Sequence, residues 1–478
     1  MKKVQAKVKN QGQVYTPAYL VRDMLDFCGY KGPDIIGKHV MENSCGDGAF
    51  LCEIVRRYCV LSECLSLKTE LETYIHGIEK DREAYDACIK NLDAIAAEFG
   101  LYGVKWDVQC GDALELSKKY YEKMDFVVGN PPYVRVHNLT DESELIKKCA
   151  FTSEGMTDLY LAFFELGMSL LAKEGVLCLI TPSSWLRSVA GSNFRKYIAK
   201  TRALNKIIDM GHFQPFNVAT YTVVTVLNNT VDTRNYFDSY SYAGAGQIEF
   251  VNHLPYTDSF INGEIYLADN VLLAELRDIS VSGTGPVSVK NGFATLCDSV
   301  FIGDFDFEKM CIPVIKASTG KWTKCIYPYK TSGAPLPEFV VMDYAPLYKY
   351  LELHRDQLVK RSIVNKNDWY LFGRTQALRD VSRDKIAINQ LVRDKESLKI
   401  NVVPAGAGVY GGLYIVSDFS VYDIKRVLET DDFINYVKAL RNYKSGGYYT
   451  FSSKDLEKYL NYKLSKDEKN EFKFIVNA

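Results

Sequence analysis

The chain has 478 residues, which is more than one hydrophobic core usually supports, so two domains are expected. Apolar residues make up 47% of the sequence and charged residues 24%, an ordinary globular composition with enough apolar material for a core. The formal net charge of −1 excludes nucleic-acid binding through bulk charge, so any such contact must come from a local basic face.

The sequence shows no signal for membrane insertion or metal binding. Residues 1–13 contain no apolar core segment, and no later stretch approaches about 18 apolar residues, so we expect no membrane contact and a cytoplasmic protein. The twelve cysteines include no Cys-x-x-Cys pair and the six histidines are scattered, so we expect free thiols and no metal. Cys52 and Cys59 lie in an amphipathic helical pattern and are expected in the core.

Strand and helix patterns alternate along the first half of the chain, which predicts a parallel α/β sheet. Seven strands are expected, at 38–42, 74–78, 104–110, 124–129, 175–181, 204–210 and 221–228, the last two as a hairpin-like pair. Helices are expected at 48–59, 82–99, 158–172 and 193–201.

Two short motifs flank the beginning of this pattern. Tyr15-Thr16-Pro17 precedes a helical stretch, with Thr16 expected as the N-cap and Pro17 in the first helical position. After the first strand, the turn from Glu42 through Phe50 contains Ser44, Gly46 and Gly48, and its two glycines let a ligand approach the backbone closely beside a helix N-terminus. The spacing is not that of a dinucleotide site. An acid here suits a ligand that carries a cationic sulfonium and an amino group.

Further acids follow the next two strands. Glu79 ends the second strand, and Asp112-Ala113 follow the third, so both acids are expected at the edge where open α/β sheets bind their ligands. A carboxylate in the position of Glu79 suits ribose hydroxyls, and one in the position of Asp112 suits an exocyclic amine.

The fourth strand ends in Asn130-Pro131-Pro132-Tyr133. Asn130 offers a side-chain carbonyl and Pro131 a backbone carbonyl held at a restricted φ, while Tyr133 offers a stacking face. Two acceptors that converge on one NH2 group can align its nitrogen lone pair for attack on an electrophile. The segment is therefore predicted to bind a flat ring that bears an amino group.

In chain order these motifs, with Asp158-Leu159-Tyr160 and Thr181-Pro182-Ser183, resemble the gamma-group N6-adenine DNA methyltransferases of type II restriction-modification systems, the Asn-Pro-Pro-Tyr family that includes the TaqI-type enzymes. The resemblance covers about residues 12–230. It implies a Rossmann-like class I S-adenosylmethionine-dependent methyltransferase domain with a seven-stranded sheet at 1–240. A mixed α/β target-recognition domain would then occupy 241–478.

The resemblance also implies roles for individual residues. The cofactor S-adenosylmethionine would be walled by Tyr15, Thr16 and Pro17. Its remaining contacts would come from Glu42, Ser44, Gly46, Gly48, Glu79, Asp112, Ala113 and Asn130. The target base would be held by Asn130, Pro131, Pro132, Tyr133 and a second aromatic ring, Phe216, for which Phe213 is a rival. The adenine would be flipped out of the duplex and methylated directly, without a metal or a covalent enzyme intermediate.

The second half of the chain is expected to contact DNA. Gly285–Asp304, which contains Lys290–Asp298, resembles the opening of a target-recognition domain, although Leu296 stands where glycine is expected. Residues 354–399 contain eleven Lys/Arg against six Asp/Glu, with Trp369, Tyr370 and Phe372 interleaved. Such clustering is typical of a phosphate-binding surface with stacking groups. The segment 441–453 is a second basic and aromatic candidate.

The predicted partners are double-stranded DNA and a separately encoded restriction endonuclease. The protein is expected to act as a monomer, to be cytoplasmic and to be of bacterial or phage origin. Three alternatives stay open: methylation of a protein glutamine, methylation of structured RNA, and a non-catalytic DNA-binding specificity subunit. The target sequence and the biological role are not readable from the sequence.

Overall fold

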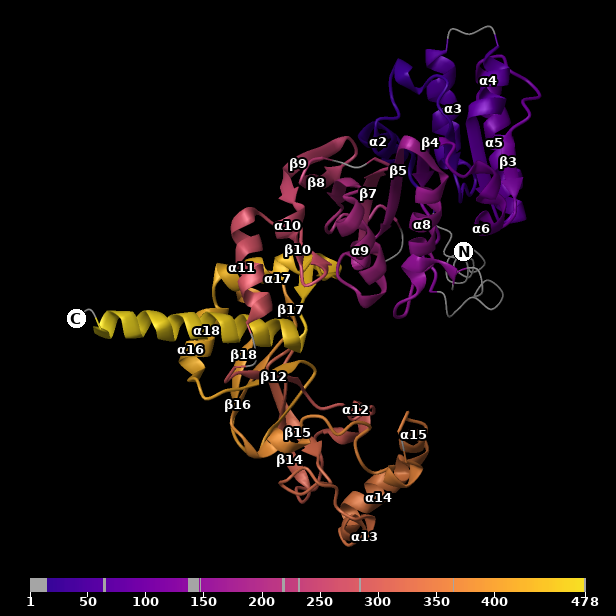
Figure 1. Cartoon of the computed structure of the whole chain (residues 1–478). Helices are drawn as coiled ribbons and strands as arrows, with labels where there is room; N and C mark the ends of the chain where they lie inside the picture. The colour runs from indigo at the N-terminus through magenta and orange to yellow at the C-terminus, as the bar shows by residue number, and fades with distance from the viewer. Residues whose placement is uncertain are drawn as a thin grey trace. The chain divides into compact units, whose positions relative to one another are not determined.

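The computed structural model describes residues 15–62, 66–135, 146, 148–216, 220–230, 233–282, 285–363 and 365–476, with the backbone alone after 466 (Figure 1). The chain divides into two compact units, Met1–Ala274 and Glu275–Ala478. Residue 240, after which the sequence placed the domain boundary, lies inside strand β8 (Tyr236–Gly244), and the first unit continues beyond it. In the described part of the chain, no helix is long and apolar enough to cross a membrane.

The first unit is built on one nine-stranded sheet with the order β3-β2-β1-β4-β5-β7-β6-β8-β9. Its strands are β1 (Val40–Glu42), β2 (Ile75–Glu79), β3 (Asp107–Cys110), β4 (Met124–Gly129), β5 (Leu171–Pro182), β6 (Leu204–Asp209), β7 (Thr222–Asn228), β8 and β9 (Gln247–Pro255). The first five pair in parallel, and β7 runs antiparallel to both β5 and β6.

The prediction of seven strands is wrong, because two more join the sheet at its edge. β8 pairs in parallel with β6, with Lys206 opposite Asp238, and β9 pairs antiparallel with β8. The alternation in β8 is visible locally, but its partner lies about thirty residues away in sequence, and register with β6 comes from tertiary pairing. The predicted hairpin-like pair at β6 and β7 is confirmed.

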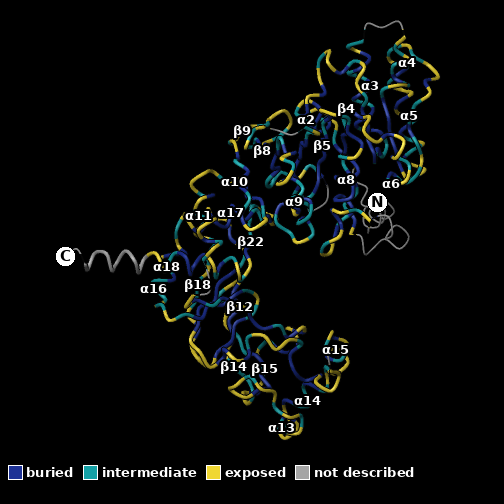
Figure 2. Tube along the Cα trace, viewed as in Figure 1, coloured by how far each residue is buried: buried dark blue, intermediate teal, exposed yellow. Residues whose placement is uncertain are grey.

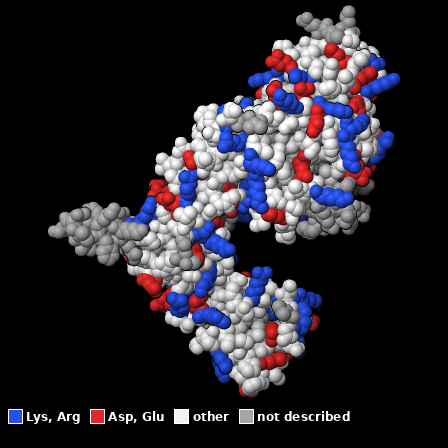
Figure 3. Space-filling model, viewed as in Figure 1, with Lys and Arg blue, Asp and Glu red and all other residues white. Residues whose placement is uncertain are grey.

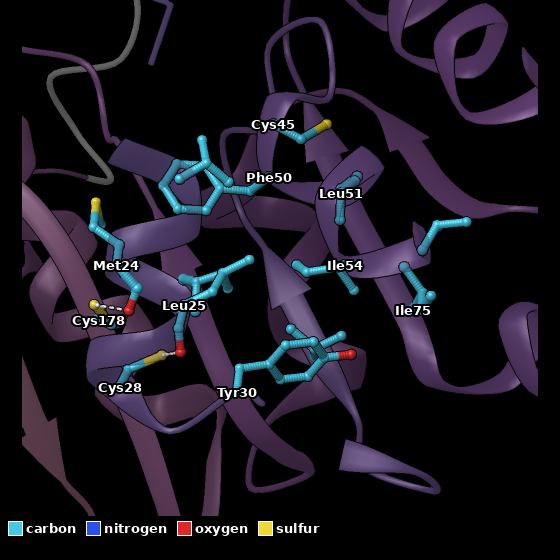
Figure 4. Packing of buried hydrophobic residues seen from close by; sticks show 14 of the residues in the cluster. Met24, Leu25, Cys28, Tyr30, Cys45, Phe50, Leu51, Ile54, Ile75 and Cys178 are labelled. Atoms are coloured by element: carbon cyan, nitrogen blue, oxygen red, sulfur yellow. Dashed lines mark hydrogen bonds between the residues drawn. The ribbon is translucent and has the colours of Figure 1, made fainter. Parts of the chain in front are cut away.

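The helices of the first unit cover both faces of the sheet. They are α2 (Ala18–Cys28), α3 (Ala49–Leu61), α4 (Leu67–Tyr74), α5 (Arg82–Glu98), α6 (Ala113–Leu116), α8 (Tyr160–Leu170), α9 (Ser192–Thr201), α10 (Tyr256–Ser259) and α11 (Asn270–Val281), which crosses the division between the units. Met24 and Leu25 of α2 pack with Phe50 and Ile54 of α3 beside the sheet (Figure 4). Cys59 is buried and Cys52 packs against this core, as expected.

Thr16 does not cap α2, contrary to the prediction. The helix begins at Ala18 with Pro17 as its N-cap, and the cap makes no side-chain hydrogen bond. The Thr16 hydroxyl instead accepts a hydrogen bond from Asn130 Nδ2 at 3.2 Å. A long-range contact therefore takes the hydroxyl that local sequence rules assign to the helix.

The second unit contains three smaller sheets and the remaining helices. The sheet orders are β12-β20-β16-β18, β13-β15-β14-β19 and β17-β22-β21. The strands are β12 (Ser288–Asn291), β13 (Ile302–Gly303), β14 (Cys311–Lys316), β15 (Lys321–Ile326), β16 (Lys385–Ile388), β17 (Leu391–Val392), β18 (Ile400–Val403), β19 (Gly408–Tyr410), β20 (Leu413–Val416), β21 (Tyr443–Lys444) and β22 (Tyr448–Thr450). The helices are α12 (Asp298–Phe301), α13 (Glu338–Met342), α14 (Ala345–Leu353), α15 (Arg355–Val359), α16 (Val421–Leu428), α17 (Asp431–Ala439) and α18 (Ser453–Val476). Buried residues follow the strands in both units (Figure 2).

Candidate active site

The turns that follow β1, β2 and β4 meet at one edge of the large sheet. Gly46 N donates to Glu79 Oε2 at 2.7 Å, which ties the turn after β1 to the end of β2. Ser44 Oγ donates to the Asn130 carbonyl at 3.5 Å, which ties the same turn to the end of β4. Because parallel strands end at the same edge, residues far apart in sequence are brought into direct contact there.

Glu42 lies at the centre of this edge. Its side chain is 3% exposed, and Oε2 has no hydrogen-bond partner among the described residues. Burial raises the pKa of the Glu42 carboxyl well above its usual range. A Cβ on Gly129 would lie 3.4 Å from Glu42 Cγ, so the end of β4 packs closely on this acid. The site therefore holds a carboxyl group that a cationic ligand would ionise.

The two glycines of the first turn share a backbone requirement, and Gly48 has a steric one in addition. Gly46 has a φ of +55° and Gly48 a φ of +87°, both in the left-handed region. A Cβ on Gly48 would also lie 2.8 Å from Cys88 Sγ of α5. Any side chain at position 48 would thus displace α5 or the turn.

The acids after β2 and β3 are both engaged by protein groups. Glu79 accepts from the backbone N–H groups of Gly46 and Asp81, each at 2.7 Å. Asp112 caps α6 through a 2.9 Å bond from Leu114 N to Oδ1, and its Oδ2 accepts from Lys80 Nζ at 3.2 Å. A ligand amine at Asp112 must share this oxygen with the Lys80 ammonium or displace it.

Asn130 and Tyr133 are positioned by hydrogen bonds to other elements. Asn130 Nδ2 donates to Thr16 Oγ1, and the Tyr133 hydroxyl donates to the Ile180 carbonyl of β5 at 2.9 Å. Pro131 is buried, while Pro132 and Tyr133 are half-buried. Tyr15 is 55% exposed and lies at the rim of the same turn. Its ring carbon Cε1 would be 3.7 Å from a Cβ atom added to Gly46.

Tyr133 has two aromatic neighbours, Phe216 and Tyr160. The rings of Tyr133 and Phe216 meet edge to face, with centroids 6.4 Å apart, and Tyr160 approaches Tyr133 at the same centroid distance. Phe213 instead packs against Tyr242, 5.0 Å between centroids. Phe216 is 5% exposed, so a base stacked on the Tyr133 face that meets Phe216 would have to move the Phe216 ring.

Two residues at this edge, Lys80 and Cys88, were not expected from the sequence. Lys80 directly follows the acid Glu79. Cys88 gave no local signal, because a thiol in a helix is usually structural. Asn43 is 1% exposed, and neither polar atom of its side chain has a hydrogen-bond partner within the described ranges.

The aromatic residues predicted to face DNA in the second unit are core residues, which corrects that part of the prediction. Trp369, Tyr370 and Phe372 are 1%, 5% and 6% exposed and belong to one hydrophobic cluster. Arg361 is buried and donates to the carbonyls of Thr295 and Trp369, so it stabilises this core.

The basic character of residues 354–399 is only partly at the surface. Lys385 is also buried, and burial lowers its pKa to about 8. Exposed cations of the segment include Lys360, Arg374, Arg379 and Lys399. On the face shown in Figure 3, lysine and arginine side chains are interspersed with acidic ones. A DNA-facing role for the exposed cations stays a prediction.

Leu296, which stands where glycine was expected, has a left-handed backbone. Its φ is +58°, the conformation that glycine adopts most easily. Its side chain covers Gly373, where a Cβ would lie 2.4 Å from Leu296 carbons. The chain thus keeps the turn that glycine would favour and uses the larger side chain for packing.

Comparison with known proteins gives a consistent result. Residues 49–216 match the family described as Eco57I restriction-modification methylase. RM.Eco57I of Escherichia coli, described as a type II restriction enzyme and methyltransferase, is 23% identical over 87% of this chain and 53% of its own length. The type II methyltransferase M.BstVI of Geobacillus stearothermophilus is 27% identical over 77% of this chain and 75% of its own length. This chain therefore spans about half of the length of RM.Eco57I.

A solved structure supports the fold. The type IIL restriction-modification enzyme MmeI, in complex with DNA, superposes with a TM-score of 0.63 at 14% identity. The match covers 94% of this chain and 64% of that protein. At this identity the likeness shows a shared fold alone, and the chemistry has to be argued from the residues.

Proposed function

We propose that this chain, in which residues 49–216 match the Eco57I restriction-modification methylase family, is a site-specific DNA methyltransferase. It transfers a methyl group from S-adenosylmethionine to N6 of an adenine that is flipped out of a short duplex sequence. It serves as the modification enzyme of a restriction-modification system, acts as a monomer and is cytoplasmic. The observation that carries the proposal is the meeting of Glu42, Asn130 and Tyr133 at one sheet edge.

The donors at this edge fit S-adenosylmethionine, which when bound supplies an electrophilic methyl group on a sulfonium. Glu42 has a buried oxygen that is unpartnered among the described residues and is suited to the positive end of such a ligand. The glycine turn allows close approach of the backbone, and Glu79 oxygens keep lone pairs for ribose hydroxyls. Tyr15, Thr16 and Pro17 form the rim on one side, and Asp112 with Ala113 is assigned to the adenine end.

The chemistry at the target amine depends on the orientation of Asn130. Because Nδ2 donates to Thr16, the other end of the amide, Oδ1, is the end that can accept from an amino group. With the Pro131 carbonyl it forms a pair of acceptors that favours a pyramidal nitrogen and stabilises its developing positive charge. The base is held by stacking on Tyr133, with Phe216 as second ring, and the remaining requirement is in-line positioning.

The proposal is tested by incubating the full chain with labelled S-adenosylmethionine and unmodified genomic DNA, followed by mapping of modified bases at single-base resolution. The expected result is N6-methyladenine at one short recurring sequence. If N4-methylcytosine were found instead, the target base would be cytosine and not adenine, since both bases present an exocyclic amine. Transfer only to structured RNA or to a protein glutamine would replace the substrate class, and no transfer with retained DNA binding would indicate a specificity subunit.

A further inference from the structure

Arg135 follows the target-base motif at a defined position. The Val134 carbonyl accepts from Leu159 N at 2.8 Å, and Arg135 forms an antiparallel bridge with Asp158. Val134 is 6% exposed, whereas Arg135 is exposed. The backbone at Arg135 is thus held by Asp158 and Leu159, which directly precede α8, while the residue is exposed.

The spacing places this cation beside the aromatic platform. In an extended segment, residues two apart lie about 7 Å from each other and direct their side chains to the same side. Arg135 follows Tyr133 by two residues, the buried Val134 lies between them, and the pairing of 134–135 with 158–159 is that of extended antiparallel backbone. A guanidinium on Arg135 can therefore reach groups attached to a ring that stacks on Tyr133.

Arg135 differs from the other cations of this sheet edge in its partners. Among the described residues it has no acidic partner within ion-pair distance, even though Asp158 is its neighbour in the bridge. The cations that follow β2 and β5 do have acidic partners: Lys80 with Asp112 at 3.2 Å, Arg82 with Asp86 at 3.0 Å and Arg187 with Glu264 at 2.9 Å. Among the described residues, an anion that binds Arg135 would therefore break no ion pair of this side chain.

We propose that Arg135 binds a phosphate that adjoins the flipped adenine, and so holds the extruded nucleotide from its backbone side while Tyr133 holds its base. This inference rests on the proposed function. Rotation of a nucleotide out of the helix costs a few kcal/mol and leaves its phosphates at the mouth of the pocket. An arginine fork matches two phosphate oxygens in one plane, which a single ammonium cannot do.

The test uses the full chain and a duplex that contains the mapped target sequence. Arg135→Ala is expected to weaken duplex binding about tenfold and to lower the slope of log affinity against log salt by about one. It should also reduce the fluorescence of 2-aminopurine placed at the target position, which reports unstacking. Lys200→Ala is the matched control: it removes one exposed cation from the last turn of α9 and should change none of these readings. Arg135→Lys should restore the salt slope but only part of the affinity.

The contacted phosphate is identified by replacing it with a neutral methylphosphonate next to the target adenine. This replacement should weaken duplex binding by the wild-type chain. It should cause little further loss of affinity in Arg135→Ala, which has already lost the contact. The proposal would be overturned if the affinity losses from the methylphosphonate and from Arg135→Ala were additive. It would also be overturned if Arg135→Ala weakened binding equally for duplexes with and without the target sequence. Unchanged thermal unfolding and cofactor binding establish that the variant is folded. If the wild-type chain methylates no DNA, the proposed function fails; if it does and Arg135→Ala binds normally, only this inference fails.

Discussion

The sheet edge around Tyr133 and the segment around Trp369 look alike in sequence, because each combines aromatic rings with polar or cationic side chains. In the structure they differ. Tyr133 is half-buried beside residues that follow other strands, whereas Trp369 is 1% exposed within the core of the second unit. Position relative to strand ends therefore predicts which residues meet at one sheet edge, whereas local composition did not predict which aromatic residues are exposed.

The physical reason lies in how each region is assembled. The carboxyl ends of parallel strands must meet at one edge, and their loops cannot be covered by the sheet. The second unit has short strands and small sheets, so it depends on large aromatic side chains to fill its core. Trp369 contacts Tyr348 and Tyr370, and Phe372 contacts Phe293 and Phe301. Rings that could stack on bases are used for packing instead.

The largest expected effect tests the core assignment. Trp369→Ala should lower the free energy of unfolding by about 3–5 kcal/mol, because a fully buried indole leaves a cavity. Trp322, on β15 of the same unit and 47% exposed, provides the control, and Trp322→Ala should change the free energy of unfolding by about 0.5 kcal/mol or less. Denaturant unfolding of the full chain measures both. If Trp369→Ala had normal stability but weakened duplex binding, Trp369 would be a DNA-contacting surface residue and the core assignment would be wrong.

The next effect concerns the acceptor at the sheet edge. Asn130→Ala should lower the rate of methyl transfer about 10²–10³-fold, since it removes one of two acceptors that stabilise charge on the amine. Cofactor affinity should change much less. Thr16→Val should cause a smaller loss of rate, because it frees the Asn130 amide without removing it. Single-turnover rates measure the loss, and full activity of Asn130→Ala would refute the assigned role.

The two candidate stacking rings can be separated directly. Tyr133→Ala and Phe216→Ala should each weaken binding of a duplex with an extruded target base by about 1–3 kcal/mol. Tyr133→Phe keeps the ring and loses only the bond to Ile180, about 1 kcal/mol. Phe213→Ala, which removes a ring that contacts Tyr242, should leave base binding unchanged. If Phe213→Ala gives the larger loss, Phe213 is the second ring.

The smallest effect is a pH dependence from Glu42. Burial raises its pKa, so this carboxyl is protonated in the free protein over a wider pH range than usual. A sulfonium ligand favours the ionised form, so binding should release a proton. Affinity should then rise with pH by at most about tenfold per pH unit, until pH exceeds the pKa of the free protein. Calorimetry in buffers of different ionisation enthalpy measures the released proton, and Glu42→Gln should abolish the pH dependence. Proton uptake would contradict this assignment.

Much of the first unit could be predicted from sequence. Short-range alternation and glycine turns located β1 through β7 to within a few residues, and strand ends placed Glu42, Glu79, Asp112 and Asn130 at one edge. The contacts that join them, such as Gly46 to Glu79 and Asn130 to Thr16, link residues 33 and 114 positions apart and left no local trace.

The sequence by itself determined the order of strands, turns and motifs, because each depends on residues a few positions apart. Only the tertiary structure decided that Phe216 meets Tyr133, that Thr16 serves Asn130, that β8 and β9 extend the sheet, and that Trp369 is buried. Each of these outcomes depends on which of several residues, distant in sequence, contacts a given ring, hydroxyl or strand edge. Local pattern gives the candidates, and packing of the whole unit selects among them.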